Sequence, residues 1–239
     1  MSRIWVLTGY LVRALFGSLA GVAPLAAAVT FGLIAFEYGM DQAQLFTVGG
    51  LGIGVIGFLA TLLLAGKADR AASYLLVGRL RSRTELLAAI GAGGWCITWA
   101  LALGIVSVNL LAGRLTLSWP SLLWLVPTWS VLWLLTSALA VALSGLVSRG
   151  ASNLLGYLLL VVILVANDRQ TELLERGASW AVRIAERVTW PVGALLAEAS
   201  AGVHGRTYLL ALALVLFLAA ALFLLAAYLF RDKDVLWSE

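Results

Sequence analysis

Six apolar stretches of membrane-spanning length constrain the fold of this 239-residue chain more than any other feature. A helix needs about 20 predominantly apolar residues to cross the hydrocarbon core of a bilayer. The fifth stretch has a central run of only 13 residues, so it crosses with little tilt, borrows polar flanking residues, or re-enters the same side. We predict an all-α membrane protein with six transmembrane helices in a single domain, residues 1–239. The stretches are Ala14–Phe36, Leu45–Gly66, Leu86–Leu111, Leu122–Val147, Leu154–Ala166 and Thr207–Phe230.

Composition agrees with this class of protein. Hydrophobic residues make up 62% of the chain and charged residues 12%, whereas soluble domains carry about 25% charged residues. A net charge of +4 would favour nucleic acid as a partner of a soluble protein, but here the basic residues lie at the ends of spans, where topology explains them. The single cysteine, Cys96, lies in an apolar run and is interpreted as a small buried hydrophobic residue.

The distribution of basic residues predicts the orientation of the spans. With a cytoplasmic N-terminus, ten of the 16 lysines and arginines lie on the cytoplasmic side. Five of the other six lie in or beside one long outer loop, and the short outer loop of residues 37–44 contains acids but no base. Because cytoplasmic loops are enriched in lysine and arginine, we expect both termini in the cytoplasm.

Two segments outside the spans are expected to lie on the membrane surface. Residues 1–13 carry Arg3 and Arg13 and have no cleavage site of the signal-peptide kind, so they predict a retained interfacial helix. Residues 167–206 alternate apolar and charged positions at helical spacing, which predicts outer amphipathic helices that break before Pro191. Two interpretations stay open for the outer helices: a lid over the bundle, or a role in substrate passage.

Catalytic and energy-coupling residues are scarce. A lone histidine, His204, offers no metal cluster or two-histidine haem site, so we expect no metal and no catalytic or cofactor-binding residue in this chain. Ser144 and His204 are the only candidates for the nucleophile and the base of an intramembrane serine hydrolase. The glycine expected two residues before the serine is missing. The spans contain no acidic or basic side chain for a proton or sodium relay. Gly66-Lys67 is followed by Ala68, which excludes a phosphate-binding loop.

Small residues at helical spacing suggest close helix packing. Gly17 and Gly21 in the first stretch, and Gly50 and Gly54 in the second, each form a Gly-x-x-x-Gly pair that allows another backbone to approach. The alternative is that glycine is simply common in membrane helices.

Four tryptophans lie deeper than the expected interfacial belts. Trp95 and Trp99 share one helix face, as do Trp129 and Trp133, because each pair has i, i+4 spacing. Such faces line a path for an aromatic or lipid-like molecule, or they pack within the protein or against lipid.

The most specific feature is the basic segment 67–83 between the second and third stretches. Its alanines and leucines fall on one helical face and its arginines on the other, which suits a short helix lying flat under the membrane. Glu85 follows near the positive end of the next helix. A plain positive-inside loop is the alternative interpretation.

The order of parts resembles the exporter-type, or type-2, permeases of ABC transporters. The shared parts are an interfacial helix, two spans, the basic helix, three spans, an outer helical hairpin, a final span and a polar tail. Leu80-Arg81-Ser82-Arg83-Thr84-Glu85 resembles the Pro-x-Ser-Arg-like stretch of that family. The sequence departs from the family in having Leu80 in place of proline, and Ala71-Ala-Ser-Tyr74 in place of the frequent Gly-Thr-Leu-Glu.

The resemblance implies a homodimer of permease subunits in a bacterial inner membrane, each bound to a cytoplasmic ABC ATPase. In that case ATP and Mg²⁺ lie in the partner, this chain is not itself an enzyme, and a hydrophobic or amphipathic substrate moves outward. Segment 67–83 is then the cytoplasmic coupling helix, flanked by Arg3 and Arg13 of the interfacial helix. A non-transporting scaffold subunit remains the alternative. The residues implied at the ATPase contact are Asp69, Arg70, Arg79, Arg81, Arg83 and Glu85.

Overall fold

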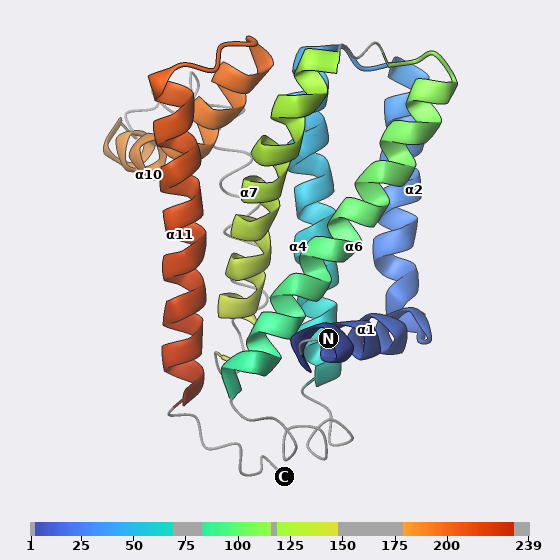
Figure 1. The fold of residues 1–239 in the computed structure, drawn as a ribbon, viewed down its shortest axis with the longest axis vertical. Helices are drawn as coiled ribbons and strands as arrows, with labels where there is room; N and C mark the ends of the chain where they lie inside the picture. Colours follow the sequence, from blue (N-terminus) through green and yellow to red (C-terminus); the bar gives the residue numbers. More distant parts are fainter. Residues whose placement is uncertain (1–2, 69–82, 116–118, 148–178, 232–239) are drawn as a thin grey trace.

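The computed structural model describes residues 3–68, 83–115, 119–147 and 179–231, and every regular element within those ranges is a helix (Figure 1). The prediction of an all-α fold is confirmed for this part of the chain. Five helices are long and apolar enough to cross a membrane, and they match the first four and the last predicted spans. The predicted fifth span, Leu154–Ala166, lies outside the described residues. The five helices are Leu19–Tyr38, Gln42–Ala68, Thr84–Leu111, Ser121–Leu143 and Arg206–Phe230.

These spans are built from named elements along the chain. A 3-10 turn, η1, opens the first span, and a short helix and a π turn, α3 and η2, open the second. Between α7 and the last helix lies α10, which is too polar to count as a span. The elements are α1 (Arg3–Phe16), η1 (Leu19–Gly21), α2 (Val22–Tyr38), α3 (Gln42–Gln44), η2 (Leu45–Gly49), α4 (Gly50–Ala68), α6 (Arg83–Leu111), α7 (Trp119–Leu143), α10 (Ser179–Ser200) and α11 (Arg206–Arg231).

The first predicted span begins later than expected. Residues up to Phe16 belong to α1, which lies across the ends of the spans (Figure 1). Leu7, Leu11 and Leu15 repeat every four residues and are buried, so this apolar face belongs to the surface helix. Apolar character alone did not distinguish an amphipathic helix from the start of a span.

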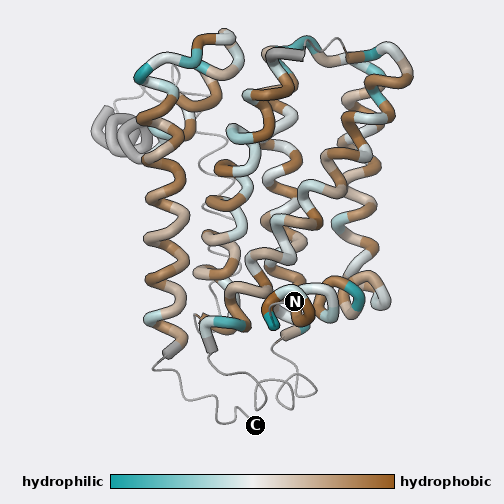
Figure 2. Tube along the Cα trace, viewed as in Figure 1, coloured by the Kyte–Doolittle hydropathy of each residue, from teal (hydrophilic) through white to brown (hydrophobic). Residues whose placement is uncertain are grey.

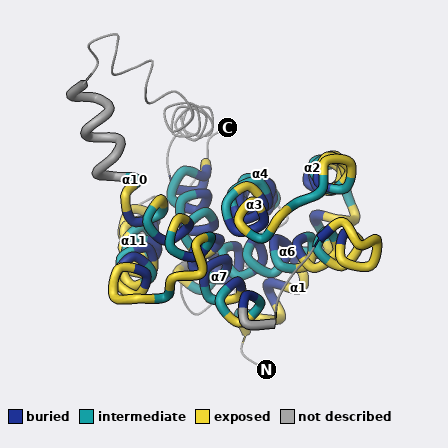
Figure 3. The backbone as a smooth tube through the Cα atoms, turned by 90° about the horizontal axis from the view of Figure 1, so that it is seen from above, coloured by how far each residue is buried: buried dark blue, intermediate teal, exposed yellow. Residues whose placement is uncertain are grey.

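Helices α11, α7, α4 and α6 pack in that order, and α2 lies at the edge against α4 and α6 (Figures 1 and 3). The apolar windows of α2 and α11 are each 22% buried, whereas that of the second span is 67% buried. Most residues along α2 and α11, the two edge helices, are hydrophobic (Figure 2). Faces of this kind are compatible with contact to lipid in a multi-pass membrane protein.

Three helices end at the same end of the bundle, which we call the far end because α1 lies at the opposite one (Figure 1). Gly39, Gly113 and Gly202 follow α2, α6 and α10, with φ of 69°, 67° and 71°. After α6, the Arg114 N–H donates to the Asn109 carbonyl at 2.9 Å, which closes a Schellman turn. Glycine adopts this left-handed backbone without a steric penalty.

The predicted break before Pro191 is wrong. Helix α10 runs from Ser179 to Ser200 with Pro191 inside it. A proline removes one backbone hydrogen bond and crowds the preceding turn, so it weakens a helix without necessarily ending it. The rest of the predicted outer segment, residues 167–178, lies outside the described residues.

Candidate functional site

The α1 end of the bundle brings the interfacial helix together with both ends of the basic segment. One hydrophobic cluster contains Leu11 of α1, Ala68 at the end of α4, Leu86 at the start of α6, and Phe230 near the end of α11. The Thr8 hydroxyl also donates to the Ala89 carbonyl at 3.2 Å, which ties α1 to α6. This cluster, which we call the α1-end cluster, therefore holds the two helix ends that residues 69–82 connect.

Of the six residues expected at an ATPase contact, the structure describes Arg83 and Glu85. Asp69, Arg70, Arg79 and Arg81 lie outside the described residues. Arg83 is the first residue of α6, and Glu85 is half-buried in its first turn. A carboxylate there is stabilised by the positive end of the helix dipole.

Arg3 and Arg13 of α1 are exposed. Arg13 lies on the side of the helix that faces away from its buried leucines, whereas Arg3 lies one turn before Leu7 at the start of the helix.

The four deep tryptophans come together between α6 and α7. Ring centroids lie 6.3 Å apart for Trp95 and Trp99, and 4.9 Å apart for Trp129 and Trp133. Trp99 bridges the two helices, with its centroid 4.9 Å from that of Trp133. Trp129 and Trp133 are 1% and 0% exposed. The structure thus places these residues in one packed tryptophan cluster.

Two of the four indole N–H groups in the tryptophan cluster have partners. Trp133 donates to the Gly50 carbonyl at 2.9 Å, and Trp95 donates to the Ser130 carbonyl at 3.2 Å. The Nε1 atoms of Trp99 and Trp129 are buried without a hydrogen-bond partner. Burying an unpaired donor costs stability, which the large apolar contact area of these side chains offsets.

The second predicted glycine pair lies against the tryptophan cluster. A Cβ on Gly50 would lie 2.8 Å from Trp129 Nε1, and a Cβ on Gly54 would lie 3.3 Å from Trp133 Cδ1. The first pair is placed differently. Gly17 and Gly21 lie in the corner between α1 and α2, where a Cβ on Gly21 would meet the Leu15 carbonyl oxygen at 2.7 Å. That pair therefore turns the chain and does not form the face of a span.

One close contact between spans, the crossing of α4 and α6, was missed by sequence reasoning. Gly57 of α4 lies under the Thr98 side chain of α6, and Gly94 of α6 lies under the Thr61 side chain of α4. Each threonine hydroxyl donates to the carbonyl four residues earlier at 2.7 Å, so neither polar group is left unpaired. The signal was present as two small-x-x-x-small patterns, Gly57 to Thr61 and Gly94 to Thr98.

His204 belongs to a far-end aromatic cluster. Its ring stacks on Trp124 with centroids 4.0 Å apart and planes 14° apart, and Tyr208 lies edge-on to both rings. The Tyr208 hydroxyl lies 2.9 Å from Thr128 Oγ1. Because the Thr128 hydroxyl donates to the Trp124 carbonyl at 2.7 Å, Tyr208 is the donor in the second bond.

The serine hydrolase interpretation finds no support in this geometry. His204 contacts Trp124 at the start of α7, whereas Ser144 follows the last residue of α7. Twenty residues of helix separate positions 124 and 144, which corresponds to roughly 30 Å. The Ser144 hydroxyl donates to the Val141 carbonyl at 2.7 Å. The two groups do not meet in one chain.

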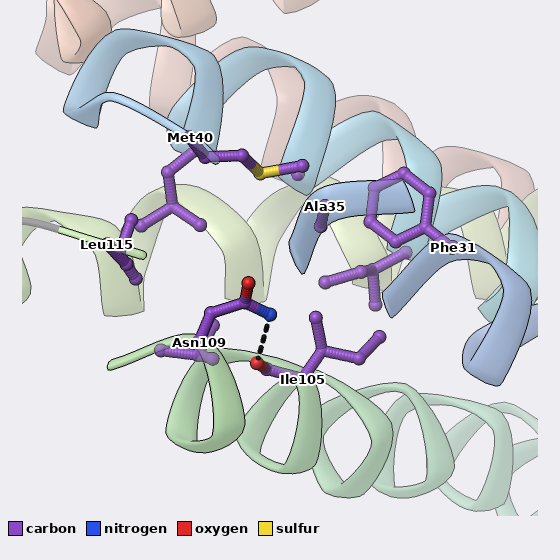
Figure 4. A pocket seen from close by; sticks show the side chains of 10 residues that line it. Phe31, Ala35, Met40, Ile105, Asn109 and Leu115 are labelled. Atoms are coloured by element: carbon purple, nitrogen blue, oxygen red, sulfur yellow. Dashed lines mark hydrogen bonds between the residues drawn. The ribbon is translucent and has the colours of Figure 1, made fainter. Parts of the chain in front are cut away.

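A narrow pocket lies at the far end between α2, η2 and α6 (Figure 4). It leaves only about 10 Å³ of free space, about what one water molecule needs. Asn109 is its one polar side chain, and its amide donates to the Ile105 carbonyl at 2.8 Å. The lining residues are Phe31, Ala35, Met40, Leu45, Gly49, Ile53, Ile105, Val106, Asn109 and Leu115.

Among the described residues, charged side chains in the spans lie only near the helix ends, and no group of three or more metal-ligating side chains is found. No known protein family, curated protein or solved structure matches this chain. Function must therefore be argued from the residues and their arrangement.

Proposed function

We propose that this chain is the membrane-spanning permease subunit of an ATP-driven ABC exporter. The observation that carries the proposal is the arrangement at the α1 end. The interfacial helix and both ends of the basic segment share the α1-end cluster, which makes this end a platform for a partner. On this proposal, residues 67–83 form the coupling helix, and the partner ATPase supplies ATP binding, Mg²⁺ and hydrolysis.

The lack of charge within the described spans supports an external energy source. Ion-coupled transporters keep ionisable groups inside the membrane despite their cost of roughly 2.5–3.5 kcal/mol each on insertion scales. Here the buried polar side chains of the spans are threonines, serines and one asparagine. A permease of this composition needs a partner that performs work on it.

The edge helices support assembly into a dimer. Their exposed apolar faces offer surface for a second copy or for lipid, and α2 and α11 are the least buried of the described spans. We place the fifth of six spans at Leu154–Ala166, the outer helices on the external side, and the protein in a bacterial inner membrane with both termini cytoplasmic. The uncharged interior favours a hydrophobic or amphipathic substrate.

A non-transporting scaffold subunit is the second candidate. The observation that favours it is the tryptophan cluster, where Trp129 and Trp133 are buried and pack against Trp99, as side chains with a structural role do. Such a subunit would use the same α1-end platform to anchor a complex.

The test is affinity purification in mild detergent of the intact chain and of a variant with Arg79→Glu, Arg81→Glu and Arg83→Glu. A double variant, Arg114→Glu with Arg206→Glu, is the matched control, because both of its arginines are exposed at the far end. We expect an ABC ATPase to accompany the intact chain and the control and to be lost from the triple variant. Absence of an ATPase from all three preparations overturns the exporter proposal and favours the scaffold.

A further inference from the structure

The surface of α1 that faces away from the bundle combines one cation with aromatic side chains. Arg13 is exposed, as are Tyr10 and Phe16, which lie three residues before and after it. Residues three positions apart are neighbours on a helix surface, so Arg13 is flanked by an aromatic residue on either side. Trp5, about two turns before Arg13, is 53% exposed. We call Trp5, Tyr10, Arg13 and Phe16 the outer face of α1.

No acid neutralises the outer face of α1 among the described residues. The helix carries Arg3 and Arg13, both exposed, and it contains no aspartate or glutamate. The first acid of the sequence, Glu37, lies near the end of α2, at the far end of the bundle. The Arg13 guanidinium has no ion-pair partner in the part of the chain that the structure describes. The helix therefore presents two positive charges to its surroundings.

Helix α1 packs against the side of α6 and not beneath its end (Figures 1 and 3). The Thr8 hydroxyl donates to the Ala89 carbonyl, one and a half turns into α6. One turn further on, a Cβ at Gly93 would lie 3.6 Å from Val12 and 3.7 Å from Thr8. The inner face of α1 is thus closed by the bundle, and its outer face looks sideways, away from the spans.

These contacts place α1 near the boundary between headgroups and hydrocarbon. The span Thr84–Leu111 has 28 residues and is therefore about 42 Å long. Because the hydrocarbon core is about 30 Å thick, the ends of this span reach into the headgroup regions. Ala89 and Gly93 lie about 8 and 14 Å along the helix from Thr84. Amphipathic helices that lie in the membrane plane occupy this depth.

Lipid is the occupant that fits this position and this set of side chains. Tryptophan and tyrosine are enriched where a membrane meets water, because their rings are apolar and their N–H and O–H groups are polar. A guanidinium at the same depth is matched by the phosphate of a lipid headgroup, to which it forms charge-assisted hydrogen bonds. A soluble partner would approach from beyond the helix ends, whereas the outer face of α1 points along the membrane.

We infer that the outer face of α1 binds anionic phospholipid, with the lipid phosphate at Arg13 and the upper part of an acyl chain against Trp5 and Phe16. A basic residue close to a bilayer surface favours anionic over zwitterionic lipid by about fivefold. The inference requires only that the described helices span a membrane, so it stands or falls separately from the exporter proposal.

The test is photolabelling of the full chain reconstituted in phosphatidylcholine vesicles. The probe is a trace of phosphatidylglycerol or of phosphatidylcholine, each with a diazirine in the upper half of one acyl chain, and adducts are mapped by mass spectrometry. Phe217 and Leu224 on α11 are exposed apolar residues and report ordinary lipid contact. We expect adducts on the outer face of α1 with both probes. Their ratio to the α11 adducts should be about fivefold higher for phosphatidylglycerol.

Three variants assign the preference to Arg13. Arg13→Gln should lower the preference for phosphatidylglycerol by about fivefold, because it removes the charge at the centre of the outer face. Arg13→Lys should keep most of the preference, since the charge remains. Arg206→Gln, at the exposed start of α11 and at the far end, is the matched control and should leave labelling of α1 unchanged. Arg13 and Arg206 are both exposed, so all three variants should elute like the unmodified chain in size exclusion.

Each result decides one part of the inference. Absence of α1 adducts with both probes means that lipid does not cover the outer face, which overturns the site. Equal labelling of α1 by the two probes overturns the preference for anionic lipid. Loss of the preference in Arg206→Gln as well as in Arg13→Gln, or equal loss in Arg13→Lys and Arg13→Gln, overturns the role of the positive charge at Arg13.

Discussion

Thr98 of α6 occupies the space that a side chain at Gly57 of α4 would need. The same contact recurs one turn along with the roles exchanged, because Thr61 of α4 covers Gly94 of α6. Two antiparallel spans therefore cross through a reciprocal pair of glycine–threonine contacts. Membrane helices lack a hydrophobic force between them, so close backbone approach of this kind contributes much of their association.

Gly57→Ala should destabilise the crossing. The added methyl group would overlap Thr98 Oγ1 and force α4 and α6 apart, at a cost of about 1–3 kcal/mol for overpacking. The apparent melting temperature in detergent measures the effect. Gly104→Ala is the control, because a Cβ at this exposed position in α6 meets nothing within 4 Å. An equal loss in both variants would contradict a specific role for the crossing.

Trp133→Phe should weaken the tryptophan cluster. It removes the indole N–H that donates to the Gly50 carbonyl and part of a side chain that is 0% exposed. We expect a loss of about 1–3 kcal/mol from the hydrogen bond and the cavity together, measured by denaturant titration in detergent. Trp190→Phe, at a position that is 47% exposed, should have little effect.

Tyr208→Phe isolates one hydrogen bond at the far end. The phenyl ring keeps the packing around His204 and Trp124 but loses the bond to Thr128 Oγ1. Hydrogen bonds between membrane helices contribute about 0.6 kcal/mol on average, so the loss should be of that order. Tyr228→Phe, at a position that is 65% exposed, is the control. If both variants have the same apparent melting temperature as the unmodified chain, the hydrogen bond contributes nothing measurable to stability.

Gly202→Ala tests the turn between α10 and α11. Gly202 has φ of 71° and is followed by a bond of 3.0 Å from the Val203 N–H to the Glu198 carbonyl. Alanine is disfavoured in this left-handed conformation, so the variant should lose about 1 kcal/mol. Gly205→Ala, with open space around it and no left-handed backbone, should be neutral. Hydrogen exchange at residues 200–206 distinguishes the two.

Sequence alone located the described spans because their apolar runs are long and uninterrupted. It misplaced the start of the first span, since the last residues of α1, Ala14 to Phe16, continue into that apolar run without belonging to the span. It found the i, i+4 pairing of the tryptophans, but only the helix crossing shows that Trp99 meets Trp133. The stack of His204 on Trp124 joins residues 80 positions apart, and spacing along one helix cannot predict such a contact.

The π turn of the second span changes which residues of this helix point towards the core on its two sides. Each residue of an α-helix advances the direction of its side chain by about 100°, and a π turn takes up an additional residue. Leu45 and Phe46 in the turn, and Ile53 after it, are thereby all buried in one cluster. Deleting one residue between 45 and 49 would straighten the turn and rotate the short helix at its start out of register. The spacing of inward-facing residues in the second span therefore shifts by one residue at the π turn. The pattern of buried positions after Gly49 does not continue the pattern before it.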